Sequence, residues 1–219
     1  MNVRDPRFVT AIRLITATAV LIGVILDASG DSTVLSLLPY FTIQSSIAYG
    51  VFAAWAATRS WRGELSTPAP LKGAVTLYVT ITGLVFHFVL DNPASGFAQL
   101  GVHRTPAEAV ANQLLHTVVP LLAVLDWLLF DERGRYKWRY ALYWLAFPLF
   151  YLGFALVRGL IVHKYPYPFL DVNDLGYGGV AQSAVFFALF FYLLALLFVV
   201  IDRVPAALRR RRAADQIEA

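Results

Sequence analysis

Long apolar runs alternate with short polar segments along this chain of 219 residues. We predict membrane-spanning helices at about 8–28, 40–58, 73–91, 108–130, 140–162 and 179–201. Each run holds roughly 19–24 residues, enough for a helix to cross about 30 Å of hydrocarbon. The runs are continuous and do not alternate with a period of two, which favours helices over a β-barrel. The expected fold is an all-α, polytopic integral membrane protein, with one six-helix domain over residues 1–219.

The amino-acid composition agrees with this expectation. Hydrophobic residues make up 58% of the chain and charged residues 15%, whereas a soluble domain carries roughly 25% charged residues. Cysteine is absent, which excludes disulfides, thiolate chemistry and cysteine-ligated metals. The net charge of +4 requires no nucleic-acid partner, because its distribution across the membrane accounts for it.

Lysine and arginine concentrate on one side of the predicted bundle. That side carries most of the 18 basic residues, namely Arg4, Arg7, Arg59, Arg62, Lys72, Arg133, Arg135, Lys137, Arg139, Arg203 and Arg209–Arg212. The other side has only Arg104 and Lys164. Basic residues favour the cytoplasmic side, so we expect both termini in the cytoplasm. Arg13 and Asp126 lie just inside the inner boundary, where we expect them to snorkel or to pair with each other.

Polar residues recur inside the apolar runs at nearly one depth. Counted from the cytoplasmic charges, Thr42 lies about 25 Å into the membrane, and His87 and His116 about 22 Å. Three more polar residues fall close to this layer: Gln44, Asn112 and Arg158. Ser45 follows Thr42 on one polar stripe of its helix. Polar groups in hydrocarbon are costly and mark functional sites, so the sequence predicts a site in the outer third of the membrane.

A hydroxyl beside an imidazole is the arrangement of a nucleophile and its general base. We therefore predict that Thr42 attacks an acyl group while His116 accepts its proton. The remaining candidates would support the reaction or bind substrate: Gln44, Ser45, His87, Asn112 and Arg158, with Gln44 and Asn112 as oxyanion donors. The outer loop 163–178 is a candidate lid, with Asp171 or Asn173 reaching towards His116. No metal and no cofactor is implied. Each residue alone also has a structural explanation, so the hypothesis rests on their convergence.

Two short motifs resemble those of a known family. The run from Pro39 to Ser45 around Thr42, and the run from Asn112 to Thr117 followed by Pro120, resemble the androgen-induced and androgen-dependent integral membrane hydrolases. That family cleaves fatty acid esters of hydroxy fatty acids with a threonine and a histidine. The segment Tyr165–Val172 resembles its bacterial branch, which implies a bacterial plasma membrane location. The eukaryotic pattern has a second histidine where this chain has Gln113.

The expected partners are a lipid ester substrate and bilayer lipids. Association with a second copy of the chain, as a homo-oligomer, is an open alternative. Two other functions also remain open. The same cavity would serve a non-catalytic lipid-binding or transport protein. Alternatively, His87 and His116 would be axial ligands of haem, or ligands of a metal together with an aspartate, in a redox protein.

Overall fold

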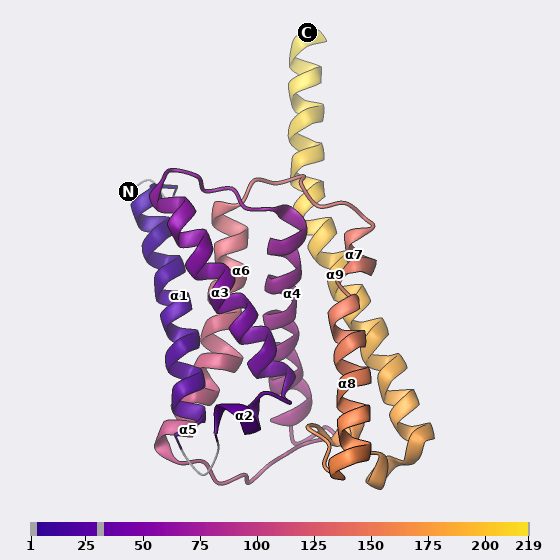
Figure 1. The fold of residues 1–219 in the computed structure, drawn as a ribbon. Coiled ribbons are helices and arrows are strands. Elements are labelled where there is room, and N and C mark those ends of the chain that lie inside the picture. Colours follow the sequence, from indigo (N-terminus) through magenta and orange to yellow (C-terminus); the bar gives the residue numbers. More distant parts are fainter. Residues whose placement is uncertain (1–3, 30–32, 219) are drawn as a thin grey trace.

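The computed structural model describes residues 4–29 and 33–218, and side chains as far as Val204. All regular elements in these ranges are helices (Figure 1), so the all-α prediction is confirmed. Five helical segments among these residues are long and apolar enough to cross a membrane: Pro6–Asp27, Ala69–Leu90, Pro106–Phe130, Tyr140–Val162 and Val172–Val204. By length and composition the chain is therefore an integral membrane protein.

The first part of the chain forms one group of packed helices, coloured indigo to pink in Figure 1. Its elements are α1 (Pro6–Asp27), the short α2 (Val34–Leu37), α3 (Phe41–Trp61), α4 (Ala69–Val85), α5 (Pro106–Gln113) and α6 (Val119–Phe130). Single π-helical turns, η1 (Phe86–Leu90) and η2 (Leu114–Val118), extend α4 and join α5 to α6. Helix α3 packs along α1, but many of its residues are Ala, Ser, Thr or Gly, so it is less apolar than the five spans.

The second group contains α7 (Tyr140–Tyr143), α8 (Ala146–Val162) and α9 (Val172–Glu218). The single helix predicted over 140–162 is interrupted after Tyr143, because Pro148 has no N–H to donate to the carbonyl of Trp144. The helix predicted over 179–201 begins earlier, at Val172, and continues to Glu218. Figure 1 shows its yellow end projecting beyond the bundle. Near its start the chain bends at Gly176, whose φ of 64° suits glycine.

The buried apolar side chains form two cores, one within the first helix group and one between the two groups. In the first group, small side chains such as Ala53, Ala56 and Ala123 allow close packing. In the core between the two groups, aromatic rings join α6 to α9, since Trp127 stacks on Phe198 with ring centroids 4.6 Å apart and on Tyr136 at 5.7 Å. The outer faces of α1, α8 and α9 expose large apolar side chains, as expected where helices face hydrocarbon.

A buried ion cluster ties four elements together near the end of the bundle where α1 begins. Asp126 of α6 accepts a 2.9 Å bond from Arg13 of α1 and also pairs with Lys72 of α4. Arg13 further donates to Ser60 of α3 at 2.6 Å. Lys72 lies 3.6 Å from Asp131 as well. The expected pairing of Arg13 with Asp126 is confirmed. Lys72, predicted as a boundary charge, is instead 1% exposed, because two carboxylates neutralise it inside the bundle.

We predict that Asp126→Ala destabilises the protein strongly. Removing the carboxylate leaves the buried cations Arg13 and Lys72 with too little negative charge, which costs about 3–5 kcal/mol of unfolding free energy. Chemical unfolding of the purified protein in detergent, followed by circular dichroism, measures the change. Glu132→Gln is the control, because Glu132 is an exposed carboxylate at the same end of α6. Equal stability of the two variants would contradict this account of the cluster.

Candidate active site

Thr42 lies in the first turn of α3, a position that the surrounding chain holds firmly. Helix α3 begins after an extended Tyr40. The preceding turn is fixed by the Tyr151 hydroxyl, which donates to the Pro39 carbonyl at 2.8 Å, and by the Gln44 amide, which donates to the Leu38 carbonyl at 2.8 Å. The first N–H groups of a helix have no partner within it. The Thr42 N–H is therefore free to bond outside the helix.

His116 lies on the π-helical turn η2, at the junction with α6. Pro120 lacks the N–H that would bond the His116 carbonyl, so the regular helical pattern is interrupted here. That carbonyl instead faces Gly83 of α4, where an added Cβ would approach it to 2.9 Å. Gly83 thus lets α4 pack close to the His116 backbone. On the other side, the Phe86 ring stacks on the imidazole with centroids 4.2 Å apart.

The structure brings Thr42 and His116 into hydrogen-bonding contact. The Thr42 Oγ1 atom lies 3.2 Å from Nε2 of His116, and His116 Nδ1 lies 3.1 Å from the Asn112 carbonyl oxygen. A carbonyl oxygen can only accept, so Nδ1 must carry the proton and Nε2 a lone pair. The Thr42 hydroxyl is therefore the donor to Nε2. This is the geometry of a nucleophile aligned with its general base.

Tyr167, which is not among the site residues predicted from the sequence, completes the site. Its hydroxyl oxygen accepts from the Thr42 N–H at 3.3 Å and lies 3.4 Å from Thr42 Oγ1. The residue belongs to the connection between α8 and α9, so the outer loop 163–178 does contact Thr42, through a tyrosine. The one signal in the sequence was the alternation of tyrosine and proline from Tyr165 to Pro168.

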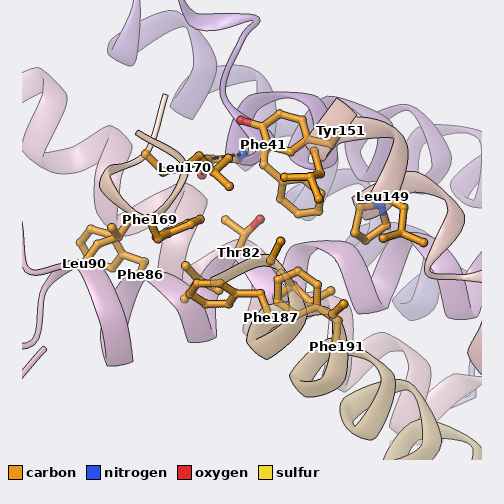
Figure 2. Close-up of a pocket in the computed structure, with 18 of the residues that line it drawn as sticks. Phe41, Thr82, Phe86, Leu90, Leu149, Tyr151, Phe169, Leu170, Phe187 and Phe191 are labelled. Carbon is orange, nitrogen blue, oxygen red and sulfur yellow. Dashed lines mark hydrogen bonds between the residues drawn. The ribbon is translucent and has the colours of Figure 1, made fainter. Parts of the chain in front are cut away.

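Two cavities of different character meet at this pair. The first, of about 80 Å³, is almost wholly apolar and runs between α3, α4, α8 and α9. Figure 2 shows Phe86 and Leu90 at one end of it and Leu149 and Phe191 at the other. Leu149 is half exposed on the outer face of α8. The cavity therefore extends to the surface that faces hydrocarbon.

The second cavity, of about 540 Å³, is a vestibule beneath the loops at the α2 and α5 end. Polar side chains line much of it, including Asp27, Gln99, His103, Arg104, Glu108 and Asn112. Thr42, His116 and Tyr167 border both cavities. The three residues thus lie between an apolar cavity and a more polar one.

The other polar residues expected on the early helices have different partners. Gln44 bonds the Leu38 carbonyl, as described above, and so braces the turn before α3. Ser45 is buried and lies 2.9 Å from the hydroxyl of Thr82, which joins α3 to α4. Asn112 contacts His116 through its carbonyl, and its position in the vestibule leaves a role towards substrate open.

Three residues expected near substrate instead hold the connection between α8 and α9. Arg158 donates to the Lys164 carbonyl at 3.0 Å. Asp171 accepts from the Asn173 N–H at 2.8 Å and so caps the start of α9. Neither Asp171 nor Asn173 borders either cavity. The predicted approach of Asp171 or Asn173 to His116 is therefore wrong, because the first N–H groups of a helix are the nearer partners.

His87 does not join the pair at Thr42. It is exposed, and its Nε2 lies 3.0 Å from the hydroxyl of Thr117. The two imidazoles thus direct their Nε2 atoms to different hydroxyl groups, and this arrangement does not favour shared axial ligation. Among the described residues, no group of three or more His, Asp or Glu side chains is arranged to hold a metal ion.

Comparison of the chain with protein-family models, with curated proteins and with solved structures finds no match. The functional assignment therefore depends on the residues of this chain and their geometry.

We predict that His116 is an Nδ1–H tautomer at neutral pH, because the Asn112 carbonyl accepts its proton. Nitrogen NMR of the protein labelled at histidine measures this directly, and the chain has four histidines, so single substitutions assign each signal. The tautomer should persist in Thr42→Val, since the carbonyl sets it. His103, exposed in a loop, is the internal control and should show a mixture. A dominant Nε2–H form at His116 would contradict the proposed direction of the hydrogen bonds.

Proposed function

We propose that this protein is an intramembrane lipid esterase, in which Thr42 is the nucleophile and His116 the general base. The observation that carries the proposal is the 3.2 Å contact between Thr42 Oγ1 and His116 Nε2, with Nδ1 held by a carbonyl. The motifs around both residues resemble hydrolases of fatty acid esters of hydroxy fatty acids. We propose the same substrate class here.

In the first half of the reaction, Thr42 Oγ attacks the ester carbonyl carbon while its proton moves to His116 Nε2. The new C–O bond gives a tetrahedral intermediate, whose former carbonyl oxygen carries negative charge. When the intermediate collapses, the bond to the alcohol oxygen breaks and His116 returns the proton to that oxygen. The hydroxy fatty acid leaves and an acyl-threonine remains.

In the second half, water attacks the acyl-threonine and His116 again accepts and returns the proton. This requires water and lipid to reach the same atoms from different sides. The apolar cavity suits the acyl chain, and the polar vestibule suits water and the departing polar product. A site that borders both the apolar cavity and the polar vestibule therefore favours hydrolysis, because this reaction needs a lipid and water at the same atoms.

The position of Thr42 supports the same chemistry electrostatically. It lies in the first turn of α3, where unpaired N–H groups and the helix dipole favour negative charge. The developing charge on the substrate oxygen would lie beside this turn. In surroundings of low dielectric, such fixed dipoles stabilise a transition state more than they would in water.

A non-catalytic lipid carrier would use the same apolar cavity, but it would not need a hydroxyl directed at an imidazole. Because the tautomer of His116 is dictated by Asn112, its lone pair is directed at Thr42 before any substrate arrives. This pre-arranged proton transfer is the observation that favours an enzyme over a carrier.

We predict that Thr42→Val abolishes hydrolysis of a hydroxy-fatty-acid ester, and that His116→Gln lowers kcat by about 10²–10⁴-fold, the usual contribution of a general base. Valine keeps the shape of threonine and removes only the hydroxyl. Release of fatty acid by the purified protein in detergent measures the rate. A fluorophosphonate probe should label native protein but not Thr42→Val.

Thr80→Val is the matched control, because the Thr80 hydroxyl bonds only the Thr76 carbonyl of its own helix, at 2.7 Å. Its rate should remain native. Full activity in Thr42→Val would refute the nucleophile. Lipid that copurifies with the native protein without any turnover would favour the carrier.

We also propose that α3 is a sixth span and that both termini are cytoplasmic, in a bacterial plasma membrane. The basic residues support this orientation. The start of α1, the end of α9 and the connections 62–68 and 131–139 lie at one end of the molecule (Figure 1), and most of the basic residues fall in these segments. Helix α3 has 21 residues, and its polar side is buried against other helices, so its low hydropathy does not prevent insertion.

We predict that single cysteines report this topology, and the absence of native cysteine makes the experiment direct. A membrane-impermeant maleimide should label Ser36→Cys and Ser95→Cys in intact cells, because both lie at the α2 and α5 end. Glu64→Cys and Glu132→Cys should react only after permeabilisation. Labelling of Ser36→Cys and Glu64→Cys from the same side would show that α3 does not span.

A further inference from the structure

The hydroxyl of Tyr167 has a proton that no described group accepts at short range. Its oxygen accepts from the Thr42 N–H at 3.3 Å, so the hydrogen points elsewhere. Thr42 Oγ1 lies 3.4 Å away, which is long for a bond between two hydroxyls. Burial raises the pKa of Tyr167, so the phenol keeps its proton at neutral pH. Tyr167 is therefore a hydrogen-bond donor beside the Thr42 oxygen.

The connection between α8 and α9 holds this tyrosine in place. The Tyr165 ring packs directly on Gly159 of α8, where no Cβ would fit. The Tyr167 ring stacks on Phe169 with centroids 5.1 Å apart and planes 6° apart. Tyr40 meets the same ring edge to face at 5.9 Å. A donor fixed in this way before substrate binds loses little entropy in the reaction, which is what electrostatic catalysis requires.

The other side-chain donors that the sequence suggested for this task are placed differently. The Gln44 amide bonds the Leu38 carbonyl, and Asn112 meets His116 through its backbone. His116 Nε2 is an acceptor, so Tyr167 is the side-chain donor that the described residues bring within 3.4 Å of the Thr42 oxygen. It also borders both cavities, so a carbonyl oxygen entering from the apolar side would meet it.

We propose that Tyr167 is a catalytic residue that donates its O–H to the oxyanion formed when Thr42 attacks an acyl group. This inference rests on the proposed esterase function. As the Thr42 C–O bond forms, the carbonyl electron pair moves onto oxygen and the Tyr167 proton hydrogen-bonds it without being transferred. The Thr42 N–H, which bonds the phenol oxygen, strengthens this donor by polarising it. When the intermediate collapses, the carbonyl re-forms and the bond weakens.

The test is Tyr167→Phe, which removes one oxygen and keeps the ring stacked on Phe169. We expect kcat for ester hydrolysis to fall by about 10²–10³-fold, the usual effect of losing one oxyanion donor, with KM changed little. The rate of fluorophosphonate labelling of Thr42 should fall in the same way, because the phosphoryl oxygen takes the place of the oxyanion. The thermal unfolding temperature should stay near the native value.

Tyr165→Phe is the matched control, since it makes the same chemical change in the same segment outside both cavities. Its kcat should be native. A native kcat in Tyr167→Phe, with loss of activity in Thr42→Val, would overturn the role of Tyr167 alone. An equal fall in both tyrosine variants would assign the effect to loop packing and would also overturn it. Native activity in Thr42→Val would overturn the proposed function and this inference with it.

Discussion

The packing of the first helix group depends on one carboxylate. Asp126 of α6 binds Arg13 of α1 and Lys72 of α4, and Arg13 reaches Ser60 of α3. A buried charge is tolerated only when opposite charges and hydrogen bonds surround it, so these four helices are constrained to cross where their charged groups meet. The constraint operates far along the bundle from Thr42. It nevertheless sets how α3 and α6 lie together; α3 carries the nucleophile, and α6 continues from the turn η2 that carries the base.

The same need for partners explains the polar residues at the opposite end. Ser45 pairs with Thr82, Gln44 with a carbonyl, and Arg158 with another carbonyl. In these hydrogen bonds the polar groups find their partners within the protein. The group formed by Thr42, His116 and Tyr167 differs because its atoms border two cavities. A ligand can therefore reach polar atoms here that are not already saturated, which separates a site from a structural network.

Much of the fold followed from the sequence, because apolar run length is a strong signal. Helices near the predicted ranges are present, and the polar depth estimate placed Thr42 and His116 at the same level, where they do meet. The role of Arg158 and Asp171 was not predictable, because it depends on the path of the connection after α8. Lys72 was misplaced because a lysine near a helix end usually reaches water, and only the tertiary structure shows the carboxylates that bury it. Tyr167 was missed because a tyrosine in a proline-rich loop commonly lies at the membrane surface.

The π-helical turn around His116 makes helix length a part of the site. One residue added to a helix rotates everything beyond it by about 100°, so the turn η2 sets the angular phase between Asn112 and Pro120. A chain that lacked one residue between His116 and Pro120 would present a neighbouring side chain to Thr42, even if it kept every residue of the motif around His116. Similarity of short motifs therefore transfers a catalytic role only when the count of residues between His116 and the flanking proline is also conserved.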